Sequence, residues 1–169
     1  MARKASKLFP EVKIFQPNSF SDNRGDIWTI WEKENILPDD LEFKLCKFAS
    51  SKKDTLRGIH GDFKTWKYMS CPQGEVLFVV VDIREDSETY LKWESYILND
   101  QNHVGVLVPP GFANAHLCTS EKCLYHYMMS YEGDYLEPKD QVLLYWNDKR
   151  LNIDWSVEKP ILAKRDTPK

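Results

Sequence analysis

The side chains best suited to chemistry gather around one histidine in the stretch TLRGIHGDFKTWKYMS, residues 55–70. His60 is flanked by Arg57 and Lys67, several tyrosines follow on a later segment, and Asp166 stands near the carboxyl end. Removal of a proton next to a carbonyl needs these types: a base, a cation for the enolate oxygen, and an acid on the opposite face. Spacing alone does not bring them together. A lone histidine in RGIHGD is equally a turn residue that hydrogen-bonds to the backbone.

A metal site is the other chemical use for this histidine. Many β-barrels bind a divalent metal through two histidines one residue apart, an acidic ligand, and a third histidine on a later strand. Here the residue two positions after His60 is Asp62, and the later His116 and His126 are not preceded by a histidine pair. The pattern therefore predicts no metal ligand.

Cysteine usage points to reduced thiols. Cys46, Cys71, Cys118 and Cys123 fall in apolar runs with no CxxC pair. This arrangement favours neither a zinc knuckle nor a disulfide framework. We expect mostly buried, reduced cysteines.

Length and charge limit the possible partners. The chain has 169 residues, which fits one domain spanning 1–169, and its 23 Lys+Arg against 26 Asp+Glu give a net charge of −3. This net charge does not favour a broad cationic surface for nucleic acid, so nucleic acid is not expected as a partner. Local clusters of Arg and Lys can still bind a small phosphate compound. No apolar run approaches the roughly 20 residues needed to cross a bilayer. The prediction is a soluble cytoplasmic protein with no membrane partner.

The elements that must position these residues read as short strands. Between residues 43 and 146, segments rich in Val, Ile, Tyr, Phe and Trp alternate with Gly, Pro, Asn and Asp, as in KYMSC, VLFVVVDI, TYLKWESYIL, VGVLVPP and HLCTSEKCLYHYMMSYE. Regular strand and turn spacing is typical of an antiparallel sandwich or barrel. EKENILPDD allows at most a short peripheral helix ended by Pro38, and the polar last segment is expected to lie across the sheet.

Two tight turns suggest a more specific fold. Gly74 in CPQGEV and the segment PPGFANAH at 109–116 lie where a barrel mouth would open. Small-molecule sites favour such mouths. The prediction is an all-β, cupin-type double-stranded β-helix, which belongs to the jelly-roll class.

Several motifs, taken in order, resemble the dTDP-4-dehydrorhamnose 3,5-epimerases, cofactor-independent cupins that act on nucleotide-linked 4-keto sugars. They are DNRG at 22–25, LRGIH at 56–60, GEV and VVDIREDSETYLKWESYIL within 74–98, VPPGFA at 108–113, YWND at 145–148 and IDW at 153–155. LRGIHGD and YEGDY are also similar to the branch that epimerises GDP-linked 4-keto-6-deoxy heptoses for capsular polysaccharide.

The resemblance implies a role for each residue at a matching position. His60 matches the catalytic base, and Asp166 matches the aspartate that fixes the base's tautomer and stabilises its imidazolium form. Tyr127 matches the proton donor, and Lys67 matches the cation beside the sugar carbonyl. Without a catalytic role, Lys67 would be a solvated strand lysine, Tyr127 an aromatic residue of the sheet, and Asp166 a charged residue of the tail.

The resemblance also implies positions that bind the substrate. Arg24, Arg57 and Arg165 match the phosphate-binding positions, where paired guanidinium donors suit a diphosphate. Asn114 stands where the family has a histidine in a GFAHG turn; it can hydrogen-bond the sugar but cannot carry a proton. His116 would lie on the same strand face.

Three positions differ from the thymidine-specific enzymes. Thr29, Leu45 and Lys47 replace a Glu, a Gln and an Asn that help to hold the nucleoside. A pocket that hydrogen-bonds one base rejects another when its polar groups stay unpaired. The changes favour GDP over dTDP, with Lys47 as a substrate-binding residue.

Competing functions remain open at this level. They are a cupin that binds a nucleotide sugar without turning it over, a sugar-nucleotide 3,4-ketoisomerase, and a metal-dependent oxygenase or isomerase. The residues do not decide between inversion at C3, at C5 or at both, and double inversion is our default. The family further implies a homodimer in which amino-terminal strands such as EVKIFQPNSF extend the partner's sheet.

Overall fold

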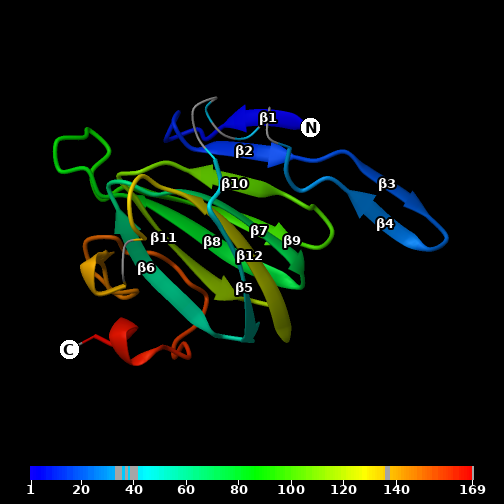
Figure 1. The fold of residues 1–169 in the computed structure, drawn as a ribbon. Coiled ribbons are helices and arrows are strands. Elements are labelled where there is room, and N and C mark those ends of the chain that lie inside the picture. Colours follow the sequence, from blue (N-terminus) through cyan, green and yellow to red (C-terminus); the bar gives the residue numbers. More distant parts are fainter. Residues whose placement is uncertain (33–35, 37, 39–41, 136–137, 169) are drawn as a thin grey trace.

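Two antiparallel β-sheets packed face to face form the body of the protein (Figure 1). The computed structural model describes residues 1–32, 36, 38, 42–135 and 138–168. The six-stranded sheet has the order β1 (Ala2–Ala5), β2 (Lys13–Gln16), β10 (Gly105–Val108), β7 (Trp66–Gln73), β12 (Lys122–Ser130) and β5 (Leu45–Lys52). The five-stranded sheet has the order β13 (Val142–Leu143), β6 (Leu56–Asp62), β11 (Phe112–Cys118), β8 (Glu75–Asp82) and β9 (Trp93–Asn99). The predicted all-β, cupin-type double-stranded β-helix is confirmed.

Alternation along the strands directs one face of each sheet inward. Met69 and Cys71 of β7 pack against Phe78 and Val80 of β8, while the residues between them face the other way. A fully buried side chain such as Phe78 stabilises the fold by roughly 1.5–3 kcal/mol. The two sheets can therefore hold polar side chains between them only where the apolar core ends.

The stretch RGIHGD is part of a strand, so the expected turn at His60 is wrong. His60 lies in β6 and pairs with Asn114 of β11. The glycines on either side serve close packing: a Cβ on Gly58, at φ +133°, would lie 2.4 Å from the Cβ of Ala115. Gly61 also lies close against β11, because a Cβ added to it would lie 2.7 Å from Cα of Ala113.

One other expectation, the division of the later strands, needs correction. The segment HLCTSEKCLYHYMMSYE is divided between the end of β11 and β12, with a turn at 119–121, and β11 already begins at Phe112 within GFANA. The described residues also contain two 3₁₀ turns, η1 (Pro138–Asp140) and η2 (Lys164–Asp166). The short helix expected in EKENILPDD stays a prediction. Most of EKENILPDD lies outside the described residues.

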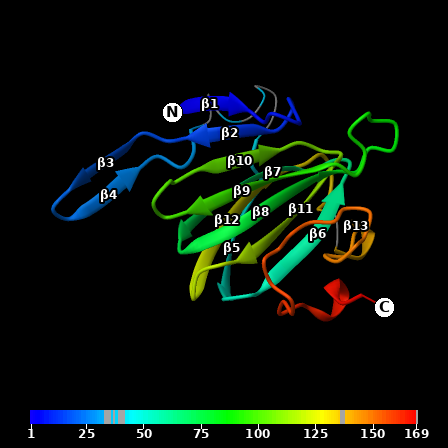
Figure 2. The ribbon, with the colours of Figure 1, turned by 180° about the vertical axis from the view of Figure 1, so that it is seen from behind.

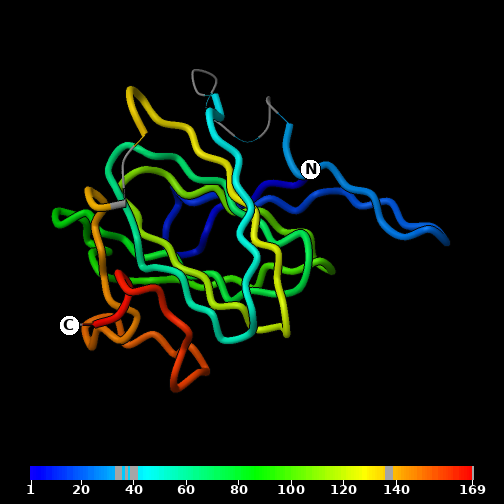
Figure 3. The backbone as a smooth tube through the Cα atoms, turned by 60° about the horizontal axis from the view of Figure 1, so that its bottom comes forward, coloured from blue at the N-terminus to red at the C-terminus, as the bar shows by residue number. Residues whose placement is uncertain are grey.

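The C-terminal tail covers the outer face of the five-stranded sheet, as predicted. Leu151 and Trp155 are buried in a cluster with Leu56 and Ile59 of β6. Ile161 then forms a bridge with Thr55. Figure 3 shows the tail, in red, on the side of the barrel away from the hairpin. Its last 3₁₀ turn, η2, carries a buried aspartate back toward β6.

A two-stranded hairpin, β3 (Ser19–Asp22) and β4 (Gly25–Trp28), projects from the barrel (Figures 1 and 2). It carries large apolar side chains into solvent: Phe20 is 66% exposed and Ile27 is 69% exposed. Among the described residues, no part of the barrel covers these two side chains.

No helix among the described parts of the chain has the length and apolar character needed to cross a membrane.

Candidate active site

A cavity of about 350 Å³ lies between the two sheets, beside the C-terminal tail. Strands β5, β6, β7, β11 and β12 contribute its walls, and the tail contributes its rim. The lining residues are Lys47, Ala49, Arg57, His60, Lys67, Met69, Asn114, His116, Tyr125, Tyr127, Met129, Tyr135, Gln141, Ala163, Arg165 and Asp166. Every site residue predicted from the sequence is among them except Arg24. The fold thus brings together groups that are far apart in the chain.

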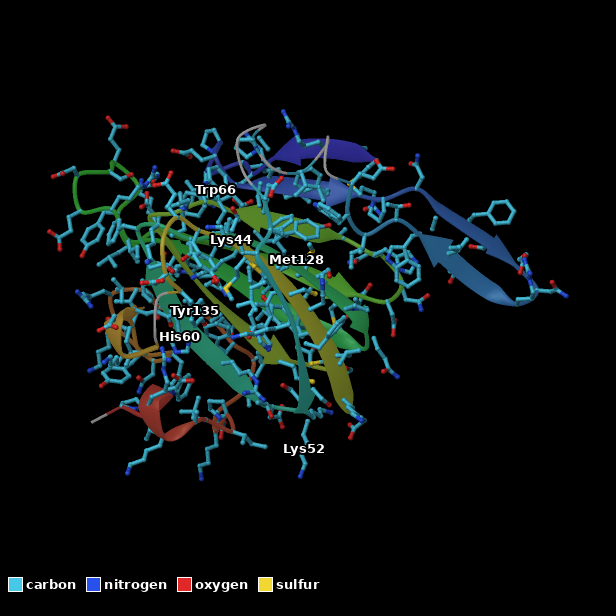
Figure 4. All side chains as sticks on the ribbon, viewed as in Figure 1. Lys44, Lys52, His60, Trp66, Met128 and Tyr135 are labelled. Atoms are coloured by element: carbon cyan, nitrogen blue, oxygen red, sulfur yellow. The ribbon has the colours of Figure 1, made fainter. Side chains whose placement is uncertain are left out.

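His60 and Asp166 form a hydrogen-bonded pair at this cavity. The distance from Nε2 of His60 to Oδ1 of Asp166 is 2.6 Å, and the aspartate side chain is only 3% exposed while that of the histidine is 23% exposed. Because Nε2 is engaged, Nδ1 is the nitrogen that can accept a proton. A carboxylate on one imidazole nitrogen fixes the tautomer and stabilises the imidazolium that forms. Figure 4 labels His60 together with Tyr135, another cavity residue.

Lys67 brings a buried ammonium group to the same cavity. Its side chain is 10% exposed, and its Nζ lies 3.3 Å from Oδ2 of Asp62. Burial lowers the pKa of Lys67, and the carboxylate of Asp62 opposes that change. Sequence reasoning identified the lysine but gave Asp62 no role in the site.

Two tyrosines line one wall of the cavity, because Tyr125 and Tyr127 point to the same face of β12. Burial raises the pKa of both phenols; at Tyr127 the nearby Lys47 ammonium opposes the rise. The Tyr125 hydroxyl is buried without a hydrogen-bond partner among the described residues. The sequence carries no signal that selects Tyr125 from the several tyrosines of this later segment.

His116 stacks on Tyr125, with ring centroids 3.8 Å apart and an interplanar angle of 19°. Its Nε2 is buried and has no partner among the described residues. Burial, together with the charges of Arg57 and His60, lowers the pKa of His116 to about 3. At neutral pH this imidazole is therefore uncharged, suited to hydrogen bonding and not to holding phosphate.

The rim of the cavity is cationic. Lys47 lies over the ring of Tyr135 at 4.7 Å, and Nε of Arg57 donates to Oγ of Ser51 at 3.1 Å. Arg165 donates to the side-chain oxygen of Gln141 at 3.3 Å. Three cations at one opening suit a diphosphate group.

The nucleoside and phosphate positions are only partly brought together. Lys47 lines the cavity, but the half-buried Leu45 and the exposed Thr29 do not. Arg24 lies in the turn of the β3–β4 hairpin, 84% exposed and paired with Asp22 at 2.6 Å. The structure therefore does not place Arg24 in the cavity of its own chain. Its hairpin projects from the barrel, and sequence order carries no information about that.

The described residues contain neither a cluster of metal ligands nor a disulfide. In the described ranges, no group of three or more His, Cys, Asp or Glu side chains is arranged to hold a metal ion. All four cysteines are free; Cys71, Cys118 and Cys123 are buried as expected, whereas Cys46 is exposed.

Comparison with known proteins places these features in a family. The family model described as dTDP-4-dehydrorhamnose 3,5-epimerase matches residues 7–169. The dTDP-4-dehydrorhamnose 3,5-epimerase of Shigella flexneri is 32% identical over 163 residues, covering 93% of this chain and 88% of that protein. The enzyme of the same name from Salmonella typhimurium is 30% identical over 164 residues, with coverage of 93% and 88%.

Solved structures agree with the sequence relatives. The crystal structure of dTDP-4-dehydrorhamnose 3,5-epimerase from Bacillus anthracis, with TDP and PPi bound, has a TM-score of 0.87 and 29% identity, covering 98% of this chain and 97% of that one. The epimerase from Legionella pneumophila in complex with dTDP-4-keto-L-rhamnose has a TM-score of 0.86 and 28% identity, covering 98% and 89%. With its fold, its cavity and these matches in agreement, the chain belongs to the dTDP-4-dehydrorhamnose 3,5-epimerase family of isomerases.

Proposed function

We propose that this chain inverts C3 and C5 of a nucleotide-linked 4-keto-6-deoxy sugar. The observation that carries the proposal is the His60–Asp166 pair at a cavity that also holds Lys67 and two phenols. The family membership supports the same reaction class, since relatives are named for it. The order of groups around the cavity fits a substrate with its diphosphate at the cationic rim and its sugar between the sheets.

Each side chain has a defined task in this reaction. Nδ1 of His60 takes a proton from the carbon beside the ketone, and the C–H electron pair forms an enolate whose negative oxygen faces the Lys67 ammonium. A phenol on the opposite wall then gives its proton to the same carbon, so the stereocentre inverts. The phenolate and the imidazolium return to their starting forms by proton exchange with solvent. Fixed positive charge near the enolate oxygen supplies much of the rate enhancement in such sites.

The proton donor is proposed to be Tyr127, with Tyr125 as the second candidate. Tyr127 matches the family position and lies close to the rim cations, whereas Tyr125 has a buried hydroxyl with no described partner. The variants Tyr127→Phe and Tyr125→Phe separate them. Loss of the acid leaves proton removal by His60 intact, so that variant incorporates deuterium without inversion. The other variant retains inversion.

Solvent exchange tests the whole proposal. The protein is incubated in deuterated water with dTDP- and GDP-linked 4-keto-6-deoxy hexoses and heptoses, and proton NMR follows C3 and C5. Exchange with inversion is the expected result, and exchange at one carbon alone would limit the reaction to that carbon. No exchange with any of these substrates would overturn the enzyme proposal in favour of a binding module, and carbonyl migration would indicate a ketoisomerase.

We further propose GDP-linked substrates, heptoses among them, in the biosynthesis of a surface polysaccharide. The relatives are named for dTDP-linked sugars, so this choice depends on the side chains that differ from those enzymes. Lys47 supports it from inside the cavity, with Leu45 beside it on the same strand face. In the exchange assay, a higher kcat/KM for dTDP sugars than for the matched GDP sugars would refute the nucleotide choice.

A homodimer is proposed on the basis of the projecting hairpin. The exposed Phe20 and Ile27 form an apolar surface that no described residue of the chain covers, and Arg24 at the turn would reach a second cavity. Light scattering after gel filtration should give twice the chain mass of 19.9 kDa. The variant Phe20→Asp should shift the protein toward monomer, and a wild-type monomer would refute the proposal.

A further inference from the structure

One carboxylate near the cavity has no part in the mechanism described so far. Asp62 ends β6, two residues after His60, and is 4% exposed. It does not line the cavity. Its Oδ1 accepts hydrogen bonds from the backbone N–H groups of Lys64 at 3.0 Å and Thr65 at 2.7 Å. The carboxylate is thus fixed by the turn that leads into β7.

The second carboxylate oxygen is directed to the lysine of the site. Oδ2 of Asp62 forms an ion pair with Nζ of Lys67 at 3.3 Å. Within the described ranges, Asp62 is the carboxylate within ion-pair distance of that ammonium. An ammonium group has three donors, so a single partner leaves two that can face a substrate oxygen.

Other titratable and charged groups line the same cavity. The cationic or protonatable groups are Lys47 on β5, Arg57 and His60 on β6, His116 on β11, and Arg165 on the tail. Tyr125 and Tyr127 on β12, whose phenol pKa values are raised by burial, are neutral at neutral pH, and Tyr135 lines the cavity beyond them. The negative charge of Asp166 is engaged by His60. Burial lowers the pKa of Lys67, and Asp62 is what opposes this.

We propose that Asp62 is a positioning residue that keeps Lys67 protonated and in place, and so sets the upper pH limit of turnover. This inference rests on the proposed function, in which the ammonium stabilises the enolate. Burial alone would raise the pKa of Asp62, but Lys67 and the two backbone donors hold it below its ordinary value. The carboxylate is therefore charged throughout the neutral range. The short connection between β6 and β7 thus holds Asp62 and Lys67 together, with the lysine charged and at the cavity.

Titration of the lysine tests the inference without any substrate. Protein labelled with ¹³C at lysine Cε is titrated by NMR, with the Lys67 signal assigned by its loss in Lys67→Arg. In Asp62→Asn the pKa of Lys67 should fall by about one unit or more, because the opposing charge is removed. The exposed loop variant Asp86→Asn, which changes net charge equally, should leave it unchanged. Equal Lys67 titration in wild type and Asp62→Asn would overturn the inference.

Turnover provides the second readout. In Asp62→Asn the alkaline limb of the kcat profile should move to lower pH by a similar amount, with KM little changed. In the Lys67→Arg background the same replacement should produce no such shift, because a buried guanidinium stays protonated. A fall in kcat that is equal at every pH would indicate a structural role instead. If no substrate turns over, the proposed function fails while the NMR titration still decides the role of Asp62.

Discussion

The neutral histidine in the cavity makes stability depend on pH in a way that can be calculated. His116 is 4% exposed, and burial with the charges of Arg57 and His60 lowers its pKa from 6.5 to about 3. The unfolded chain therefore binds a proton below pH 6.5 that the folded chain does not bind until about pH 3. Titration of His116 therefore leaves the free energy of unfolding unchanged above about pH 7.5. It lowers the free energy of unfolding as the pH falls from there toward about 3.

The size of the effect follows from the two pKa values. At pH 5 the protonated form of the His116 imidazole outnumbers the neutral form about 30-fold in the unfolded chain, while the folded chain keeps it neutral. This difference lowers the free energy of unfolding by about 2 kcal/mol. The variant His116→Phe preserves an aromatic ring against Tyr125 but has no titrating group. Between pH 7.5 and pH 5, its free energy of unfolding should fall by about 2 kcal/mol less than that of the wild type.

Urea unfolding at several pH values between 7.5 and 5 measures this difference. Contributions from other titrating groups are common to both proteins and cancel in the comparison. Asn114→Leu is the matched control, since it changes a cavity side chain on the same face of β11 without adding or removing a titrating group. It should shift stability by the same amount at every pH. Parallel curves for wild type and His116→Phe would refute the assignment of a neutral, buried His116.

Three further outcomes follow from contacts in the structure. Asp166→Asn should lower kcat by about 10²–10⁴-fold with little change in KM, since His60 loses its carboxylate, and steady-state kinetics check this. Burial alone would raise the pKa of Asp82, but three side-chain donors hold it at about 2, so Asp82→Asn should cost about 2 kcal/mol at pH 7. That contribution disappears in the wild type as the pH falls from about 4 through 2, which acid-unfolding curves would show. Gly58→Ala should destabilise the protein by at least about 2 kcal/mol in thermal unfolding, because its Cβ would meet Ala115.

Much of the fold could be predicted from the alternation of strand-forming segments with turn residues. The wrong prediction at RGIHGD has a physical reason. RGIHGD was expected to be a turn because glycine is common in turns. In the structure, Gly58 and Gly61 instead allow β6 to lie close against the alanines of β11. The two requirements, positive φ and close approach, select the same residue type. A single sequence does not distinguish them.

The site was partly accessible from sequence for a related reason. His60 and Lys67 are near in the chain and lie on strands joined by one connection, so their nearness follows from local pattern. Asp166 is 106 residues from His60, and only family resemblance indicated the pair. Tyr125 was not selected over Tyr127, because β12 presents both to the same cavity. The role of Asp62 depends on a 3.3 Å contact that spacing does not encode.

The C-terminal tail has a consequence for how activity is acquired. The barrel strands and the rim residues of β5 and β6 are complete well before Asp166 in the chain, but the base is not oriented until η2 reaches β6. Tail docking involves the Thr55–Ile161 bridge and the burial of Trp155, and it brings the rim cation Arg165 to the cavity together with Asp166. A molecule whose tail has detached would lose both the carboxylate that orients His60 and the rim cation Arg165, which leaves Lys47 and Arg57 as its rim cations. The proportion of docked tails, and not protein concentration alone, would therefore set the number of active molecules.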